Sequence, residues 1–276
     1  MAIVAKYGKP DLFVTYTCNP NVQDIMENLR DGERKEHRPD LVSRVFHLHL
    51  AELLCDIKDR QILGVPVSHV HVIEFQKTGL PHCHILIILR GENKLWTRDD
   101  IDQFISAEIP DPEEDLELYN LVKSCMIHGP CGVQNPICVC MEDGECKNNF
   151  PKPFCNETAE NINGYPAYRR RNDGRTDQIG GLVAENSYVV PYNKQLLRKY
   201  RTHINVEVCA TVDGQERQVP LRVKYVYKGH DCANMEMVLE DGERLGMKSR
   251  PISTAGMCLK CKGCASFYLK PLQGRL

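Results

Sequence analysis

Apolar residues along the chain follow two spacings, and each spacing predicts a different kind of element. The segments DLFVTYTCNP (11–20), SHVHVIEFQ (68–76) and HCHILIIL (82–89) are rich in β-branched and apolar residues, which predicts strands. In 39–57 the apolar residues recur at helical spacing. The segment 97–109 opens with a threonine cap and acidic residues, as helices do. The first part of the chain is therefore expected to alternate strands and helices.

The later part of the chain divides into a loop-rich stretch and a second group of elements. Residues 110–181 are rich in Pro, Gly, Asn and Cys, which predicts loops held by metal in place of regular structure. After them, YVVPY and HINVEVCATV predict strands and NKQLLRKY predicts a helix. The order of elements predicts an α/β (α+β) fold. We expect a central antiparallel sheet packed by helices 39–57 and 97–109, with the NKQLLRKY helix across the sheet.

Three His-x-His triplets, at 47–49, 69–71 and 82–84, raise the question of metal binding. Alternate residues on a strand point to the same side, whereas on a helix they lie about 200° apart. The triplet at 47–49 lies on a predicted helix, so its histidines are expected at the solvent or at the edge of the core. The other two triplets lie on predicted strands and remain candidates.

The short connection KTGLP (77–81) predicts a hairpin between those two strands. In a plain antiparallel hairpin Gln76 would face His82 and Glu74 would face His84, all on one sheet face. His69 and His71 would then lie on the opposite face among apolar side chains. Such a set leaves open positions on a divalent ion, which can polarise a phosphate. The competing interpretation is that both histidines only fill the polar end of a strand, and a bulge would break the register.

Composition and charge narrow the class of protein without identifying a partner. The 276 residues are 42% hydrophobic and 26% charged, enough for a substantial core. No apolar stretch approaches the roughly 20 residues of a membrane span, and the N-terminus lacks the pattern of a signal peptide. The net charge of −2 hides an acidic segment at 111–117 and basic ones at 168–171 and 194–201. Whole-chain charge therefore neither demands nor excludes nucleic acid.

Phosphate chemistry needs a nucleophile, and tyrosines near the basic segment 194–201 are candidates. Tyr188, Tyr192 and Tyr200 occur within thirteen residues. A phenol can attack phosphorus to form a covalent ester, and nearby Lys199, Arg198 or the ion would help its proton to leave. Eight residues are just over two helical turns, so the last two tyrosines can share a face. The competing interpretation is that all three only pack the fold.

Fourteen cysteines without a secretion signal favour metal ligands over disulfides. The spacing H-x2-C-x8-C-x5-C provides a tetrahedral zinc set, His128, Cys131, Cys140 and Cys146, with Cys125, Cys138 and Cys155 as spares. A loop this poor in apolar residues lacks a core of its own, so a structural zinc is expected there. CLKCKGC (258–264) offers only three closely spaced ligands and is a weaker signal.

Several long stretches together resemble one family. They are PDLFVTYTCNP, VIEFQKTGLPHCHILI, IHGPCG, NNFPKPF, VVPYNKQLLRKYRTHINVEV and VYKGHDCANMEM, in order over about residues 7–235. They are similar to the replication-initiator nuclease part of Helitron transposases, the Helitron helicase-like domain. The resemblance implies a sheet of the histidine-hydrophobe-histidine (HUH) nuclease type. It also implies a metal-dependent enzyme that nicks single-stranded DNA at transposon ends, holds the 5′ end on tyrosine and transfers the strand.

The resemblance assigns roles to particular residues. His82 and His84 match the two histidine ligands of Mg or Mn, although Cys83 replaces the usual bulky middle residue, and Gln76 matches the third ligand. The tyrosine block contains Tyr192, the first choice for the nucleophile, with Tyr200 and Tyr188 as the others. Single-stranded DNA is expected on basic and aromatic surface through phosphate contacts and stacking. The residues expected to bind it are Arg169, Arg170, Arg171 and Lys199.

The chain also departs from full-length Helitron transposases. They continue into a helicase, but no G-x-x-x-x-G-K-[ST] phosphate loop occurs here, so this chain is not expected to unwind DNA by itself. The predicted organisation is a nuclease core at 1–109, a zinc-binding insertion at 110–181, the tyrosine helix and closing strands at 182–237, and a divergent tail at 238–276. The expected location is the nucleus, without membrane contact. A catalytically inactive or domesticated DNA-binding fragment and an unrelated metallohydrolase remain as alternatives.

Overall fold

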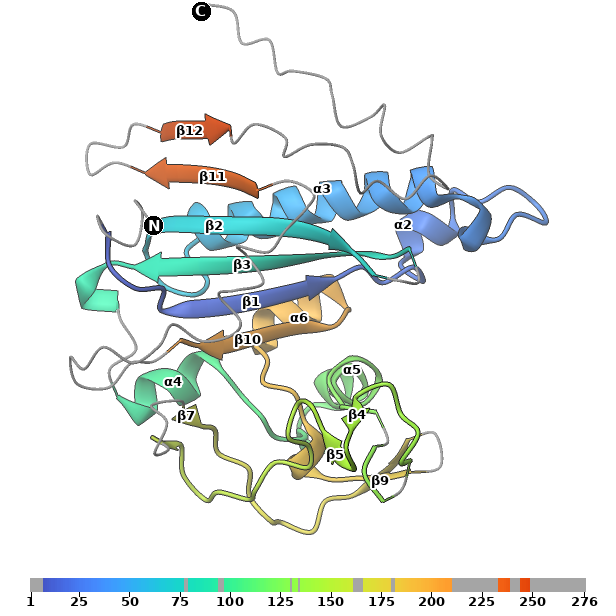
Figure 1. Ribbon diagram of the computed structural model, residues 1–276, viewed down its shortest axis with the longest axis vertical. Coiled ribbons are helices and arrows are strands. Elements are labelled where there is room, and N and C mark those ends of the chain that lie inside the picture. The colour runs from blue at the N-terminus through green and yellow to red at the C-terminus, as the bar shows by residue number, and fades with distance from the viewer. Residues whose placement is uncertain are drawn as a thin grey trace, which may run out of the picture.

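A computed structural model describes residues 7–76, 79–93, 97–129, 131–133, 135–160, 166–179, 182–209, 233–238 and 244–248. Six strands in these ranges form one sheet of order β10-β1-β3-β2-β11-β12, in which all neighbours are antiparallel (Figure 1). They are β1 (Leu12–Thr17), β2 (Pro66–Phe75), β3 (Pro81–Leu89), β10 (Ile204–Val208), β11 (Ala233–Val238) and β12 (Arg244–Lys248). The predicted antiparallel sheet is confirmed, and the predicted boundary at 237/238 falls inside β11.

The α-helices of the described residues are α2 (Gln23–Met26), α3 (Pro39–Lys58), α4 (Arg98–Phe104), α5 (Leu116–Cys125) and α6 (Lys194–Tyr200). Short 3-10 turns are η1 (Lys35–His37), η2 (Gly91–Asn93) and η3 (Asn186–Tyr188). Short strand pairs are β4 (Met141–Glu142) with β5 (Glu145–Cys146), β6 (Ala159–Glu160) with β7 (Pro166–Ala167), and β8 (Asp177–Ile179) with β9 (Leu182–Ala184). No helix among the described residues combines the length and apolarity of a membrane span.

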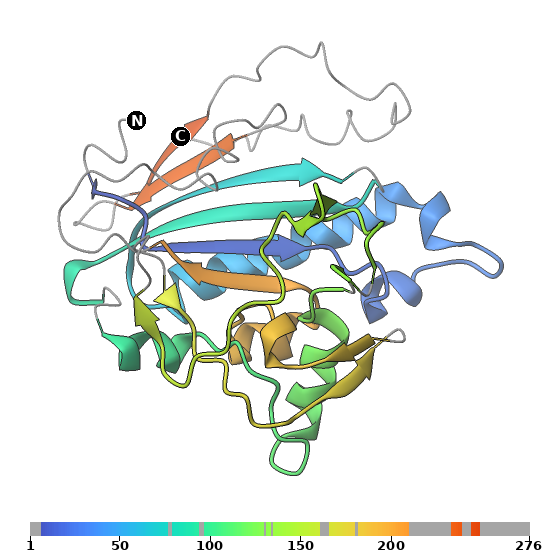
Figure 2. The same cartoon turned by 60° about the horizontal axis from the view of Figure 1, so that its bottom comes forward.

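One face of the sheet packs against helices and forms the main core, which we call the helix face. Because alternate strand residues point to one side, Val14 and Tyr16 of β1 share this face with Cys83 and Ile85 of β3. The long helix α3 runs along the sheet and α6 lies near β10 (Figures 1 and 2). Buried residues of α3, among them Phe46, Leu50 and Leu53, belong to the same core. This packing fixes the sheet that carries the histidines.

The opposite face of the sheet, the histidine face, holds a separate and smaller apolar cluster. Phe13, Val72 and Leu86 form it, and all three are buried. Toward the β2–β3 turn the same face becomes polar, because Thr15 on β1 lies opposite His84 on β3. The two faces therefore differ: the helix face packs against helices in the main core, whereas the histidine face carries a small apolar cluster and a polar end.

Several predicted elements differ from the structure. The helix expected at 97–109 ends at Phe104, with Thr97 forming the capping box that the sequence indicated. A helix lies inside the stretch 110–181 that we expected to be loops: Asp115 caps α5, whose buried Leu118, Leu121 and Val122 have helical spacing. This helix was not predicted because the surrounding sequence is rich in Pro and Cys. YVVPY forms isolated bridges in place of a strand, from Val189 to Ile127 and from Tyr192 to Ser106.

Candidate functional site

The β2–β3 hairpin places two histidines and a carboxylate on the histidine face. In its register Glu74 lies opposite His82 and Val72 lies opposite His84. Our expected register, with Gln76 opposite His82, is wrong by two residues: Gln76 lies beyond β2, and its backbone N–H bonds to the carbonyl of Leu80. The pairing is centred one residue earlier than expected, so Glu74 occupies the place predicted for Gln76. A shift of two leaves every side chain on its predicted face.

The three side chains at this hairpin converge closely enough to hold one ion. His82 Nε2 lies 3.0 Å from His84 Nε2, and Glu74 Oε2 lies 3.4 Å and 3.8 Å from those two nitrogens. Ligands about 2.1 Å from an ion are separated by about 3.0 Å at a right angle and by about 3.4 Å at a tetrahedral angle. The geometry therefore fits a divalent ion held by two imidazoles and one carboxylate, with positions left for other ligands.

Burial keeps these two imidazoles in the form that binds metals. It lowers the pKa of His82, and it lowers the pKa of His84 to about 4, with the neighbouring charge of His82 adding to the effect. Both side chains are only 14% exposed. Neutral imidazole is the metal-ligating state, so this site is prepared for an ion at neutral pH. We name Glu74, His82 and His84 the hairpin triad.

The remaining His-x-His triplets lie elsewhere. His49 on α3 is 2.7 Å from the carboxylate of Asp24, an exposed pair on α2 and α3. His69 and His71 lie opposite Ile87 and Ile85, so they share the helix face, where their rings stack with centroids 5.7 Å apart. Among the described residues, neither triplet contributes to a group of three potential metal ligands.

The predicted nucleophiles Tyr192 and Tyr200 do not face the hairpin triad. Both belong to the core of the helix face, where the ring of Tyr200 meets the ring of Tyr16 edge-on at 5.7 Å. The hydroxyl of Tyr192 donates to the carbonyl of Glu108 at 3.0 Å. Burial raises the pKa of Tyr192 to about 12 and also raises the pKa of Tyr200. The sheet itself separates these phenols from the triad.

The third candidate, Tyr188, lies beside the cysteine-rich insertion. Its carbonyl accepts the backbone N–H of His128 at 2.8 Å, and its side chain is buried. Burial raises the pKa of Tyr188, and the neighbouring thiol of Cys131 adds to the effect. Its position is therefore that of a packing residue next to the predicted zinc ligands.

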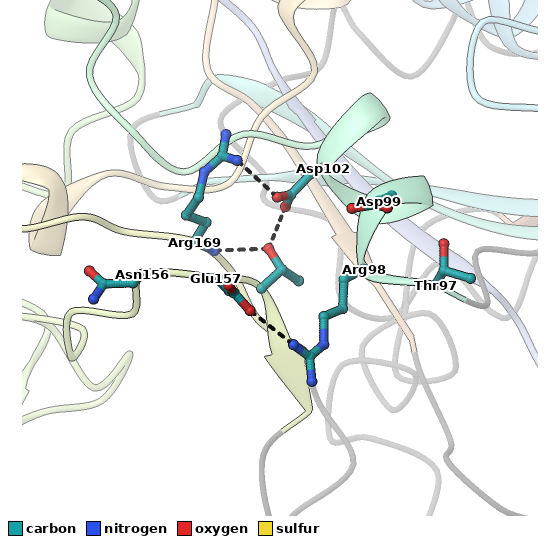
Figure 3. A pocket seen from close by; sticks show the side chains of 8 residues that line it. Thr97, Arg98, Asp99, Asp102, Asn156, Glu157 and Arg169 are labelled. Atoms are coloured by element: carbon teal, nitrogen blue, oxygen red, sulfur yellow. Dashed lines mark hydrogen bonds and ion pairs between the residues drawn. The ribbon is translucent and has the colours of Figure 1, made fainter.

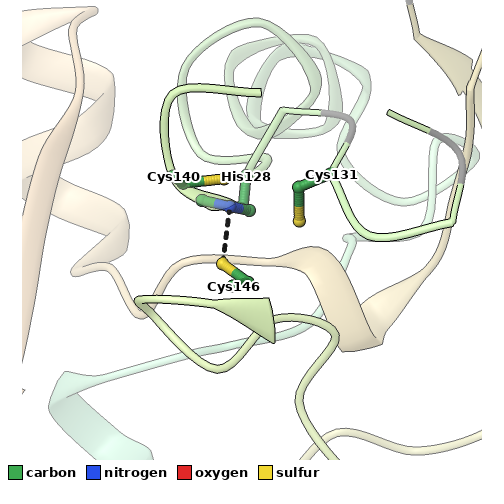
Figure 4. A group of neighbouring side chains, drawn as sticks. All are labelled: His128, Cys131, Cys140 and Cys146. Atoms are coloured by element: carbon green, nitrogen blue, oxygen red, sulfur yellow. Dashed lines mark hydrogen bonds between the residues drawn. The ribbon is translucent and has the colours of Figure 1, made fainter. Parts of the chain in front are cut away.

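Those predicted zinc ligands come together as one cluster. His128, Cys131, Cys140 and Cys146 each offer an atom within 4.8 Å of the others' (Figure 4). His128 Nε2 lies 3.5 Å from Cys146 Sγ, close to the separation of about 3.6 Å for N and S ligands on a tetrahedral zinc. Cys138 lies outside the four, with its sulfur 3.4 Å from that of Cys140. The cluster can hold a metal such as zinc.

The hairpin triad lies within a segment that a known family model describes. Residues 1–87 match the Helitron helicase-like domain at N-terminus. This segment is similar to the Helitron helicase-like domain. It contains β1, α3, β2 and most of β3, so both triad histidines and Glu74 fall inside it. No curated protein matches the chain. The match relates the protein to Helitron transposases and suggests that it acts on DNA.

The basic residues predicted to bind DNA lie outside this segment and are paired with other groups. Arg171 contacts both carboxylate oxygens of Glu108, at 2.8 and 2.7 Å. Arg169 pairs with Glu108 and with Asp102, in a cavity of about 460 Å³ that is lined by polar residues (Figure 3). Arg170 is 3% exposed and donates to backbone carbonyls, including that of Val189 at 2.5 Å.

Lys199, the fourth predicted DNA contact, is also paired. Its ammonium lies 2.6 Å from the carboxylate of Asp56 and 2.8 Å from that of Glu52, both on α3. The structure thus gives all four predicted DNA contacts a role in holding the fold. The basic segments of the sequence could not reveal these ion pairs, because the acidic partners are distant in the sequence.

Proposed function

We propose that the protein is a metal-dependent endonuclease and strand transferase that acts on single-stranded DNA at the ends of a Helitron-type transposon. The observation that supports this proposal best is the convergence of Glu74, His82 and His84 within a segment that is similar to the Helitron helicase-like domain. Its functional partner would be the helicase that Helitron transposases normally carry on the same polypeptide, whose phosphate-loop motif these 276 residues lack. The cysteine-rich cluster would hold a structural zinc.

The hairpin triad would bind a divalent ion, and that ion would supply Lewis-acid stabilisation of charge on a scissile phosphate. Magnesium binds almost entirely through oxygen, so between the two expected ions a site with two histidines and one carboxylate favours Mn²⁺ over Mg²⁺. The side chains of His82 and His84 are partly exposed at the polar end of the histidine face. A DNA strand would approach the site from that side.

A phosphotyrosine intermediate requires a tyrosine that reaches the histidine face. In the proposed mechanism the nucleophile is therefore a tyrosine other than Tyr192 and Tyr200, whose hydroxyls are engaged on the helix face. Four of the eleven tyrosines lie outside the described residues: Tyr165, Tyr225, Tyr227 and Tyr268. The nucleophile is to be found by mapping the DNA adduct over the whole chain.

One observation favours the alternative of a catalytically inactive DNA-binding fragment. The described tyrosines of the predicted block are all buried, and burial raises the pKa of each. A buried phenol that donates to Glu108 or Asp56 is a poor nucleophile. Under this alternative the fold would bind DNA and would form no covalent product.

The deciding experiment incubates the full chain with 5′- and 3′-labelled single-stranded oligonucleotides in Mn²⁺, in Mg²⁺ and in chelator. We expect nicking and a covalent protein–DNA adduct with Mn²⁺ and loss of both in chelator. His84→Ala should abolish them, whereas His49→Ala, which changes a histidine on α3, should not. Mass spectrometry of the digested adduct identifies the tyrosine. Cleavage that persists in chelator would refute the proposal, and DNA binding without cleavage would favour the inactive fragment.

A further inference from the structure

Strand β1 contributes a polar side chain to the hairpin triad through His84. Thr15 Oγ1 lies 3.1 Å from His84 Nδ1, on the side of the ring away from His82. The ring of Phe13, two residues earlier on β1, stacks on the imidazole with centroids 5.4 Å apart and an interplanar angle of 16°. β1 therefore holds this ring both by its edge and by its face.

The contact with Thr15 bears on the tautomer of His84. Metal binding through Nε2 leaves the proton on Nδ1, and the position of that proton is set by the partner of Nδ1. A threonine oxygen accepts a hydrogen bond from Nδ1–H and keeps its own hydroxyl proton available for a second acceptor. One such acceptor faces Thr15 across the β1–β10 pair: Asn205, whose Oδ1 is buried without a hydrogen-bond partner among the described residues.

The Asn205 amide leaves one acceptor open on the same face as Thr15. Its Nδ2 donates to Glu207 Oε1 at 3.0 Å, which leaves Oδ1 as the atom still able to accept. His82 offers a contrast, because its Nδ1 is buried and has no hydrogen-bond partner among the described residues. The support from a neighbouring strand is thus specific to His84.

We infer that Thr15 is a positioning residue that accepts the Nδ1–H of His84 and so holds this ring in the tautomer whose Nε2 presents its lone pair to the ion. This inference rests on the proposed function only in its requirement that the triad binds a divalent ion. Outer-shell partners of this kind typically change metal affinity by roughly 10–100-fold when removed.

The test uses the full chain loaded with a single equivalent of zinc, which the four-ligand cysteine cluster takes before the triad, and measures Mn²⁺ affinity by calorimetry and by electron paramagnetic resonance. Thr15→Val keeps the shape of the side chain and removes the hydroxyl, so affinity should fall by roughly 10–100-fold. Thr15→Ser should restore most of the affinity. Thr17→Val is the matched control on the same strand and face, opposite His82, and should bind as the wild type does.

A second measurement reports the tautomer itself. Long-range ¹H–¹⁵N spectra of the metal-free protein, with His84 assigned by comparison with His84→Ala, should show Nδ1–H in the wild type and in Thr15→Ser. Thr15→Val should shift His84 toward the Nε2–H form. If Thr15→Val does not fold, the wild-type spectrum still decides, because an Nε2–H tautomer there overturns the inference.

The outcomes separate this inference from the proposed function. Wild-type binding of Mn²⁺ that Thr15→Val leaves unchanged would overturn the role of Thr15 and leave the metal site intact. Mn²⁺ affinity that is the same in wild type and His84→Ala would overturn the metal site itself. A loss in Thr17→Val equal to that in Thr15→Val would also contradict a specific hydrogen bond to His84.

Discussion

The hydroxyl of Tyr200 lies 2.5 Å from a carboxylate oxygen of Asp56, on the opposite side of the sheet from His84. Asp56 is fully buried and also receives Lys199 and Arg60. This phenol therefore belongs to a buried charge network that ties α6 to α3. Its position explains why a tyrosine in the predicted catalytic block serves the core.

Tyr200→Phe is accordingly predicted to cost stability and to spare any DNA adduct. A hydrogen bond to a charged group contributes about 1.5–3 kcal/mol, so the free energy of unfolding should fall by about that amount. Urea unfolding measures the loss, and Tyr119→Phe is the matched control. Its hydroxyl also donates to an aspartate, Asp177, but at a more exposed place, so its loss should be smaller. An adduct that disappears while stability is unchanged would contradict this assignment.

The third ligand of the hairpin triad gives a second prediction. Glu74→Gln removes the charge of the carboxylate that lies 3.4 Å from His82. Because this carboxylate would be a direct ligand, Mn²⁺ affinity should fall by more than roughly 10-fold, the smallest loss typical of changing a residue that only contacts a ligand. Gln76→Ala alters the residue originally expected to bind and should leave the affinity close to that of the wild type. Calorimetry compares the two, and a larger loss in the Gln76 variant would restore the original assignment.

The sequence could predict features that depend on residues close together in the chain, and it could not predict those that depend on residues far apart. The faces of the hairpin were predictable, because the alternation of strand residues survives the two-residue shift that brought Glu74 in place of Gln76 opposite His82. The cysteine cluster was predictable as well, since His128 and Cys146 lie close together in the chain and their spacing is that of zinc ligands.

Long-range packing was not predictable from the sequence. The spacing of the tyrosines indicates one side of a helix, but it does not say which face of the sheet that helix covers. The burial of Leu196, Leu197 and Tyr200 in the main core settles that question for α6. The same holds for Arg171, whose partner Glu108 lies 63 residues earlier. The support from Thr15 to His84 joins residues 69 positions apart, and only the sheet brings them together.

The cysteine-rich cluster gives a prediction with a control in the same loop. Cys146→Ser removes one of the four converging ligands, so zinc bound per chain should fall by about one equivalent and the loop should become sensitive to protease. Cys138→Ser changes a neighbouring thiol outside the four and should keep its zinc. Atomic absorption and limited proteolysis measure both effects. Equal zinc loss in the two variants would place Cys138 among the ligands.

The last prediction concerns acid stability and rests on Glu108. Burial alone would raise the pKa of this carboxyl, but the hydrogen bonds and charge of Arg171 lower it below its ordinary value of 4.5. The carboxylate is therefore more stable in the folded state than in the unfolded state. Its stabilisation is fully present above about pH 4.5 and is lost as the pH falls through the lower folded value.

Glu108→Gln should remove this part of the pH dependence. At neutral pH the free energy of unfolding of the variant should be about 1–3 kcal/mol lower than that of the wild type. The reason is that Arg171 then donates to a neutral amide oxygen in place of a charged carboxylate. Below pH 4.5 the difference in free energy of unfolding between wild type and variant should become smaller, since the wild-type carboxylate becomes protonated. Urea unfolding from pH 3 to 7 measures this difference, with the exposed Glu113→Gln as the control for a change of net charge. A difference that stays constant down to pH 3 would show that Arg171 does not hold Glu108 ionised.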